Sequence, residues 1–292
     1  MNYVCSLCPR NCKAQRTETQ NIGGICKAPY AITAARAALH FWEEPCISGE
    51  EGSGTVFFSG CQLKCSYCQN FEISHNNFGK AISVKRLSEI FKRLENEGAN
   101  NINLVSPTPY LPLIREALSL YRPNIPIVFN SGGYEKTETL EEFKDIIDIY
   151  LLDFKYFSSS KAEKYSAAGN YPEIAKKAIL KASELSGAPK FDDRGIMKSG
   201  VIIRHLILPS ATNDAIGILE WVKENCPKNL FSLMDQYTVI KGVKEKELLR
   251  RVTDREYNKV ASKMMELELE GFLQEKSSAS KDFIPQFDLS GV

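Results

Sequence analysis

Between residues 54 and 237, short apolar runs alternate with longer segments in which apolar residues recur every three or four positions. The short runs match buried strands, and the longer segments match amphipathic helices. Ser83 is a favourable N-cap for one helix, whose apolar positions all fall on one face. The pattern predicts strands at residues 54–59, 101–106, 125–130, 148–154, 200–208 and 229–237. It predicts helices at residues 83–97, 111–121, 138–145, 160–185 (one or two helices) and 214–224.

Strands separated by helices predict a parallel sheet, because parallel neighbours must be joined by a crossover, which is usually a helix. Six such units predict an α/β fold, a partial (β/α)6 barrel of the TIM type. Active sites of such barrels form at the carboxyl ends of the strands. Residues at those ends are therefore the first candidates for function.

Composition divides the chain into three sections. Residues 1–53 are rich in cysteine, residues 54–242 carry the barrel pattern, and residues 243–292 hold a charged helix at 254–270 and a polar tail. We expect this helix to cover the core with its apolar stripe. The tail has four candidate anchors that could lie over the barrel or dock a partner: Phe283, Ile284, Pro285 and Phe287.

Charge and hydropathy narrow the function classes. Lysine and arginine number 37 against 36 aspartate and glutamate, and the formal net charge of +1 gives no general electrostatic reason to bind nucleic acid or an anionic membrane. Residues 1–10 contain no apolar core of signal-peptide length, and no window approaches the roughly 18 apolar residues of a membrane span. We therefore expect a cytoplasmic protein without a membrane or nucleic acid partner.

Nine cysteines, eight of them before residue 69, indicate metal binding, because disulfides are rare in a reducing compartment. The three histidines, His40, His75 and His205, do not have His-x3-His spacing, which excludes a zinc hydrolase of that type. We therefore expect metal chemistry based on sulfur ligands.

Three cysteines follow the first predicted strand at the spacing Cys-x3-Cys-x2-Cys: Cys61, Cys65 and Cys68. Thiolates on such a loop can bind three irons of a [4Fe-4S] cluster and leave the fourth iron open. A structural zinc site would need a fourth protein ligand, such as Cys46. The preceding strand, Gly60 before the first cysteine and Tyr67 before the last favour the iron-sulfur interpretation.

The stretch 54–70 (GTVFFSGCQLKCSYCQN) resembles the cluster-binding loop of radical S-adenosylmethionine (SAM) enzymes. More specifically, it is similar to the branch that resembles pyruvate formate-lyase activating enzymes, often called PflX-like. The likeness covers nearly the whole chain, since it continues at residues 35–49, 102–110, 150–156, 200–209 and 233–237. It implies a [4Fe-4S] cluster and SAM as cofactors, and a 5′-deoxyadenosyl radical that abstracts a hydrogen atom from the substrate.

In activating enzymes that hydrogen comes from a glycine of a partner enzyme, so the resemblance implies an activase-like role. The implied partners are a glycyl radical enzyme and a reductant such as flavodoxin or ferredoxin. Two alternatives stay open. One is a radical SAM enzyme acting on a small molecule or a peptide side chain, and the other is a non-catalytic iron-sulfur redox protein.

The resemblance also assigns SAM contacts to strand ends. At the second strand end, activating enzymes commonly place Gly-Gly-Glu against the SAM amino group, whereas this chain has Ser106-Pro107-Thr108-Pro109. The Thr108 hydroxyl and the backbone carbonyls near Ser106 could accept hydrogen bonds from the ammonium group. A rigid proline turn is the alternative.

Asn130 and Ser131 end the third strand, where the family has polar residues against the SAM ribose and carboxylate. An ordinary glycine turn is the alternative there. Asp153 and Lys155 are two residues apart on the fourth strand and therefore share a face. They form either a structural ion pair or, by resemblance to the Asp-x-Lys of the family, contacts near the SAM carboxylate. Tyr67, directly before the last of the three cysteines, completes the expected cofactor contacts.

Arg204 and His205 point to opposite faces of the fifth strand, so only one can face the barrel interior. We select Arg204 as a contact to SAM or substrate, because a lone histidine is more often structural. Gln236 and Tyr237, at the end of the sixth strand, are interior residues by position only.

A second cysteine group lies near the start of the chain, and we call its members the N-terminal cysteines: Cys5, Cys8, Cys12 and Cys26. Four thiolates can close a zinc site or hold a second [4Fe-4S] cluster, and their spacing does not separate the two. A zinc site would mainly fold a segment too small to bury a core of its own. A cluster would relay electrons or hold a substrate.

Overall fold

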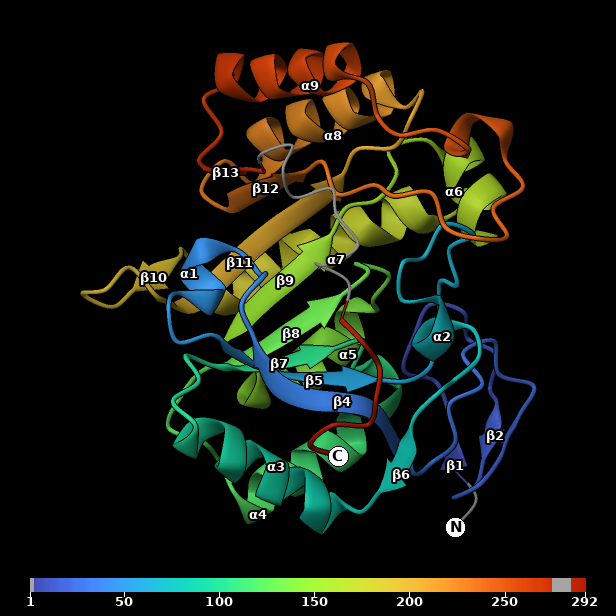
Figure 1. Cartoon of the computed structure of the whole chain (residues 1–292), viewed down its shortest axis with the longest axis vertical. Coiled ribbons are helices and arrows are strands. Elements are labelled where there is room, and N and C mark those ends of the chain that lie inside the picture. The colour runs from blue at the N-terminus through green and yellow to red at the C-terminus, as the bar shows by residue number, and fades with distance from the viewer. Residues whose placement is uncertain (1–2, 275–284) are drawn as a thin grey trace.

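A computed structural model of the protein describes residues 3–274 and 285–292. Within these residues the main sheet has ten strands, and six of them are the predicted parallel strands, adjacent in the order β12-β11-β9-β8-β7-β5 (Figure 1). The predicted α/β fold with a parallel sheet is thereby confirmed. The bounds of the six strands are Ser53–Phe58 (β5), Ile102–Val105 (β7), Ile127–Ser131 (β8), Ile149–Asp153 (β9), Met197–Leu206 (β11) and Leu230–Met234 (β12).

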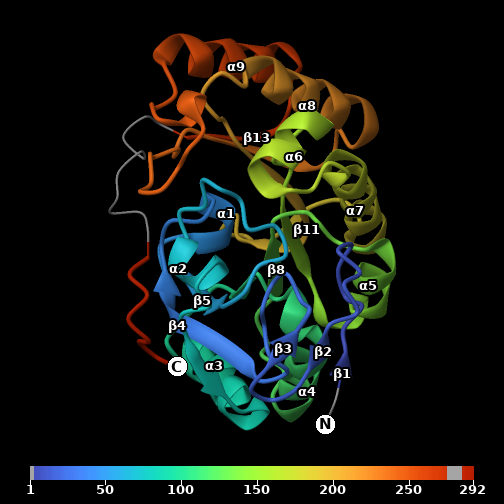
Figure 2. The ribbon, with the colours of Figure 1, turned by 90° about the vertical axis from the view of Figure 1, so that its right-hand side faces the viewer.

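Helices cover the outer face of this sheet, and Figure 2 shows α5 and α7 on the side opposite α1 and α2. The first of the predicted helices begins after Ser83, whose hydroxyl accepts a hydrogen bond from the Arg86 N–H at 3.0 Å. The last ends before Glu268, whose positive φ of 49° is a left-handed stop. The outer helices are α3 (Val84–Asn96), α4 (Leu111–Leu120), α5 (Thr137–Glu142), α6 (Ser159–Ser166), α7 (Tyr171–Ser186), α8 (Thr212–Asn225) and α9 (Asp254–Glu266).

Strands that the sequence pattern did not predict extend the sheet at both edges. β4 (Ile32–His40) pairs antiparallel with β5 and with β6 (Lys80–Ile82). β13 (Gly271–Leu273) pairs parallel with β12, and β10 (Lys190–Phe191) forms an antiparallel pair with β11. The cysteine-rich section and the C-terminal section therefore contribute strands to the same sheet as the barrel section.

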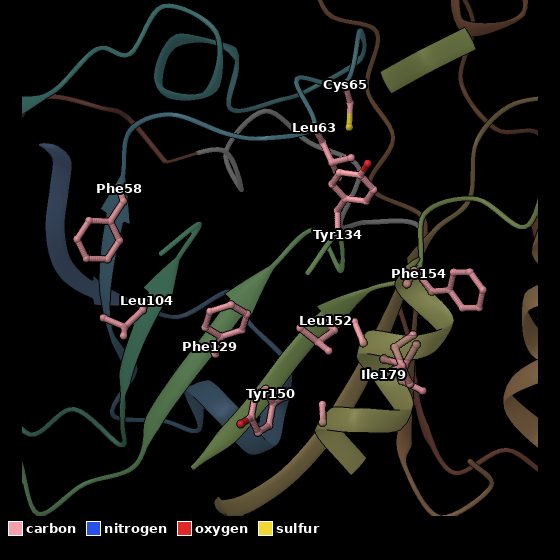
Figure 3. Close-up of a cluster of buried hydrophobic side chains, with 14 of the residues drawn as sticks. Phe58, Leu63, Cys65, Leu104, Phe129, Tyr134, Tyr150, Leu152, Phe154 and Ile179 are labelled. Carbon is pink, nitrogen blue, oxygen red and sulfur yellow. The ribbon is translucent and has the colours of Figure 1, made fainter. Parts of the chain in front are cut away.

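Alternate residues of the parallel strands fill two apolar layers. Leu104 and Phe129 lie in register on adjacent strands, in the large cluster that the outer helices cover (Figure 3). On the other face, Leu151 shares a buried cluster with Ile47 of the short helix α1 (Pro45–Ser48). Because α1 fills this part of the barrel interior, the remaining space lies toward the carboxyl ends of the strands.

The end of the chain runs beside β4 (Figure 1). Backbone hydrogen bonds of 3.0 and 2.9 Å join Leu289 and Ser290 to that strand, and the Phe287 ring packs against Phe57 at 5.6 Å between centroids. The tail therefore lies over the sheet, which is one of the two arrangements expected. Two of its four candidate anchors lie outside the described residues: Phe283 and Ile284.

The N-terminal residues form a small antiparallel sheet of their own, with β2 paired to both β1 and β3. None of the helices in the described ranges is long and apolar enough to cross a lipid bilayer. The remaining short elements are β1 (Tyr3–Val4), β2 (Gln15–Arg16), β3 (Asn21–Ile22), α2 (Phe71–Ser74) and the 3-10 turns Thr108–Tyr110, Lys144–Ile146 and Lys246–Leu248.

Candidate functional site

A cavity of about 780 Å³ lies at the carboxyl ends of the parallel strands. Its walls come from the loop between β5 and α2, from the ends of the next strands and from the segment between β4 and α1. The structure brings together there every barrel residue selected from the sequence except Thr108 and Tyr237. The selected residues that line the cavity are Cys61, Cys65, Tyr67, Cys68, Ser106, Asn130, Ser131, Asp153, Lys155, Arg204 and Gln236.

The three cysteines of this wall sit on residues 59–70, which we call the cysteine loop. It leaves β5 through Gly60, whose φ of +90° favours glycine and whose Cβ, if present, would lie 3.0 Å from the carbonyl oxygen of Cys26. The Gly60 N–H donates to the Ile73 carbonyl at 2.8 Å, and the Ser66 N–H donates to the Tyr165 carbonyl at 2.8 Å. These contacts fix the start of the loop and its middle.

All three cysteines of the loop are free thiols, and each sulfur accepts a hydrogen bond. The donors are the Leu63 N–H to Cys61 at 3.4 Å, the Ser166 hydroxyl to Cys65 at 3.0 Å and the Ser74 hydroxyl to Cys68 at 3.3 Å. Burial raises the pKa of the Cys61 thiol and raises that of Cys68 to about 12. Thiolates at Cys61 and Cys68 therefore need a bound cation, and the three hydrogen-bonded sulfurs of the loop fit an iron-sulfur cluster.

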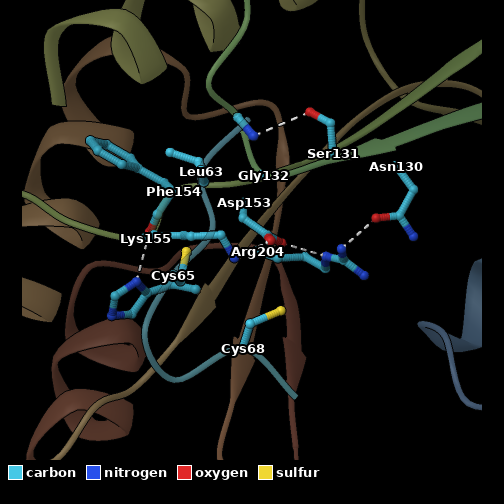
Figure 4. Close-up of polar contacts among 12 residues, drawn as sticks. Leu63, Cys65, Cys68, Asn130, Ser131, Gly132, Asp153, Phe154, Lys155 and Arg204 are labelled. Atoms are coloured by element: carbon cyan, nitrogen blue, oxygen red, sulfur yellow. Dashed lines mark hydrogen bonds and ion pairs between the residues drawn. The ribbon is translucent and has the colours of Figure 1, made fainter. Parts of the chain in front are cut away.

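A network of charged side chains lines the cavity with these cysteines (Figure 4). Arg204 donates to Asp153 at 2.9 Å, to Glu43 at 2.9 Å and to the Asn130 side-chain oxygen at 2.6 Å. The Lys155 ammonium lies 2.6 Å from the other oxygen of Asp153. Asp153 and Lys155 therefore form an ion pair that faces the cavity.

Burial opposes charge on these groups, but the opposite charges of their neighbours outweigh it. Burial by itself would raise the pKa of Asp153, yet Lys155 and Arg204 hold that pKa below its ordinary value. Burial would lower the pKa of Lys155, but Asp153 and the sulfur of Cys65 raise it. The cavity thus presents two fixed cations beside the cysteine sulfurs.

Thr108 is the one selected cofactor residue that does not line the cavity within the described chain. Its hydroxyl donates to the buried carboxyl of Glu135 at 3.0 Å, and the Gln62 amide donates to the same carboxyl at 2.8 Å. Burial raises the pKa of Glu135 to about 8 although Thr108, Ser131 and Gln62 hydrogen-bond to it. Thr108 thus belongs to the proline turn, and this placement does not support the expected contact with the SAM ammonium.

Other selected side chains lie in distinct places. Tyr67 is buried, and its ring packs edge-on against Tyr156 and Tyr237, which explains why Tyr237 lies behind the wall. Arg204 faces the cavity, whereas the buried His205 points away from it and contacts the Phe154 carbonyl at 2.7 Å.

Sequence reasoning missed two carboxylates, Glu43 and Glu44, which line the cavity between β4 and α1. Glu44 is buried, burial raises its pKa, and its Oε2 has no hydrogen-bond partner in the described chain. A buried carboxyl with an unmatched oxygen is costly unless a ligand supplies a donor. The run Trp-Glu-Glu-Pro was the available signal, but the strand that positions it was not predicted.

The N-terminal cysteines are also free thiols, and they adjoin the cysteine loop. Arg10, between Cys8 and Cys12, donates to the carbonyl of Gln62 in that loop at 2.9 Å. In residues 3–274 and 285–292, no group of three or more His, Cys, Asp or Glu is close enough to hold a single metal ion.

Comparison with known proteins gives the site a context. A family model described as Radical SAM superfamily matches residues 55–222. An uncharacterized protein of Methanocaldococcus jannaschii is 31% identical over 266 residues, which cover 87% of this chain and 72% of that protein.

Among solved structures, SuiB of Streptococcus suis aligns with a TM-score of 0.55 and 15% identity over 76% of this chain and 48% of its own. The structure of SuiB bound to S-adenosylmethionine aligns with a TM-score of 0.50 and 17% identity, over 72% of this chain and 44% of its own. HydG, a maturase of the [FeFe]-hydrogenase, aligns with a TM-score of 0.52 and 16% identity, over 77% of this chain and 52% of its own. The chain spans about half the length of these structures, and the likeness shows a shared fold.

Proposed function

Because the chain belongs to the radical SAM superfamily, we propose that Cys61, Cys65 and Cys68 hold its [4Fe-4S] cluster and that it acts as an activase-like enzyme. When bound, the cluster and SAM supply reductive cleavage of SAM to methionine and a 5′-deoxyadenosyl radical. One observation carries the proposal: three free cysteines at the carboxyl end of β5 line the same cavity as Asp153 and Lys155.

The polar wall of the cavity matches the groups that SAM carries. Lys155 and Arg204 are cations that can contact a carboxylate, and Asp153 holds both in place. Asn130 and Ser131 offer amide and hydroxyl groups to a ribose. The buried Tyr67 and its aromatic neighbours keep water from this side of the cavity.

The first test is anaerobic reconstitution of the full chain. We expect about four irons at the cysteine loop and formation of 5′-deoxyadenosine from SAM after reduction. Cys65→Ala should abolish this product, whereas Cys226→Ala, at the end of α8, should leave it unchanged. SAM cleavage that survives Cys65→Ala would refute the proposal, and SAM cleavage by the native chain excludes a non-catalytic redox protein.

The activase-like role is favoured by the cavity rim, where Phe41 and Trp42 are 48% and 54% exposed. Large apolar side chains beside an open cavity fit a protein partner such as a glycyl radical enzyme. Flavodoxin or ferredoxin is our candidate electron donor. Replacing dithionite with either protein and measuring 5′-deoxyadenosine tests that choice.

A second candidate is a radical SAM enzyme acting on a small molecule or a peptide side chain. Glu43 and the incompletely paired Glu44 favour it, because they offer acceptors to a polar substrate inside the cavity. The discriminating experiment uses extract from cells grown on deuterated glycine, separated by size. Deuterium transferred into 5′-deoxyadenosine from the macromolecular fraction, with a glycyl radical signal, supports the activase. The alternative is tested with the same measurement on cells grown in fully deuterated medium. Deuterium transfer into 5′-deoxyadenosine only from the small-molecule fraction of that extract supports the alternative.

A further inference from the structure

The topology of the small N-terminal sheet gathers all four N-terminal cysteines at one end. β1 runs antiparallel to β2, and β2 runs antiparallel to β3, so the ends of β1 and β3 meet the start of β2. Cys5 follows β1, Cys8 and Cys12 lie in the connection from β1 to β2, and Cys26 follows β3. Four cysteines from two segments, the connection between β1 and β2 and the residues after β3, therefore lie at one end of this sheet.

Arg16, on β2, places a positive charge in the same region. The residue is fully buried, and its guanidinium lies 5.8, 5.9 and 5.7 Å from the ring centres of Tyr3, Tyr30 and Tyr110. It donates to the Pro109 carbonyl at 2.6 Å and reaches the sulfur of Cys5 at 3.6 Å.

No carboxylate of the described chain pairs with this guanidinium, and its Nε is buried without a hydrogen-bond partner. A buried charge is costly unless an opposite charge lies beside it. The nearest groups that can become anionic are the thiols of Cys5 and its neighbours. Arg16 is thus an independent sign that this region holds negative charge when it is complete.

We propose that Cys5, Cys8, Cys12 and Cys26 bind a tetrathiolate metal centre, a second [4Fe-4S] cluster, whose negative charge Arg16 balances. Both the four-sulfur ligand set and the buried cation fit such a centre. The inference does not depend on the reaction proposed for the cavity.

The turn between Cys8 and Cys12 also joins this centre to the cysteine loop. Arg10 in that turn donates to the Gln62 carbonyl at 2.9 Å and to the Ser166 carbonyl at 2.7 Å. Gln62 follows the first cysteine of the loop, and Ser166 hydrogen-bonds the sulfur of Cys65. A metal that fixes the turn therefore also fixes the wall of the SAM site.

The decisive experiment removes the first cluster and asks whether iron remains. The full chain with Cys61→Ala, Cys65→Ala and Cys68→Ala is reconstituted anaerobically, and iron, acid-labile sulfide and zinc are measured. We expect about four irons and as many sulfides per chain. Absence of metal overturns the site, and a single zinc without sulfide overturns the cluster.

A converse variant guards against misfolding of that protein. Cys8→Ser with Cys12→Ser, in the chain that keeps the cysteine loop, should lower the iron content from about eight to about four per chain. Cys226→Ala is the matched control and should keep about eight. A native chain that never exceeds four irons refutes the proposal without any variant.

The role of Arg16 is tested separately, by the reduction potential of the second cluster in the chain that lacks the first. Arg16→Met keeps an unbranched side chain, shorter than that of arginine, and removes its charge. The potential should therefore become more negative, because adding an electron is then harder. Arg16→Lys keeps the positive charge, so its potential should lie close to that of the native residue. An unchanged potential in Arg16→Met would show that Arg16 does not balance the charge of the cluster.

Discussion

At the scale of single residues, the cavity depends on how its buried charges are paired. Arg204 divides its donors among Asp153, Glu43 and Asn130, and Asp153 also binds Lys155. Asp153 and Glu43 are therefore both paired with Arg204, and Asp153 is also paired with Lys155. Removing one member leaves a buried charge behind, which costs more than the pair contributes.

Asp153→Asn tests this pairing, because it keeps the shape of the side chain but removes the charge that Lys155 and Arg204 share. We expect the free energy of unfolding to fall by roughly 3 kcal/mol in urea denaturation. The control is Asp145→Asn, which breaks the ion pair between Asp145 and Arg115. Because the Asp145 side chain is 62% exposed, this change should cost less than about 1 kcal/mol. Equal losses in the two variants would contradict the argument.

Glu135 should make stability depend on pH in an unusual direction. The unfolded chain releases this proton near the ordinary pKa of 4.5, whereas burial keeps it on the folded chain up to about pH 8. Between these two pH values the folded state binds more protons than the unfolded state. The free energy of unfolding therefore falls as pH rises, by on the order of a few kcal/mol in total.

Glu135→Gln should remove that slope, and urea denaturation at pH 5.5, 7 and 8.5 measures it. The control is Glu142→Gln, an exposed position on α5, which should keep the slope of the native chain. Parallel pH profiles for the native chain and Glu135→Gln would show that Glu135 is ionised in the folded state.

At the scale of elements, the parallel strands were predictable because buried strands are continuous apolar runs and the helices between them repeat every 3.6 residues. β4 was not, since its sequence Ile32–His40 is rich in alanine, which favours helices, and its strand form comes from pairing with β5. The site followed the same division. Strand alternation put Asp153 and Lys155 on one face and set Arg204 opposite His205, and the family resemblance then favoured Asp153 as a site residue. Glu43 depends on β4, and Thr108 on a 3-10 turn that turns it inward.

The cysteine loop is an element held from outside by Arg10, which donates to the carbonyls of Gln62, Ser166 and Ala167. Arg10→Gln removes hydrogen bonds from a charged donor, each about 1.5–3 kcal/mol. We expect the loop to open at least roughly tenfold more often, and iron to be lost correspondingly faster to a chelator. Lys13→Gln, an exposed residue of the same segment, is the control. Equal rates of iron loss would show that Arg10 does not brace the loop.

At the scale of the whole molecule, the cavity is shared by all three sections of the chain. The family model covers residues 55–222, yet the cavity wall also contains Glu43 from the N-terminal section and Phe272 and Pro285 from the C-terminal section. The chemistry common to the superfamily resides in the matched part. Specificity for a substrate is therefore best sought in the flanking parts, which this chain adds around the common barrel.

The C-terminal tail provides the last test of this arrangement, because Phe287 packs against a small buried cluster of Ala35, Phe57 and Ile73 at the edge of the cavity. Phe287 is only partly buried, so Phe287→Ala should cost about 1–2 kcal/mol of unfolding free energy, less than the 3–5 kcal/mol of a core phenylalanine. Leu120→Ala, at a side chain 62% exposed, should change it by less than about 0.5 kcal/mol. If the tail also closes the cavity, limited proteolysis should cut Phe287→Ala near the C-terminus faster than the native chain, while the iron content stays the same. Equal cleavage rates and equal stability would show that the tail rests on the sheet without holding it.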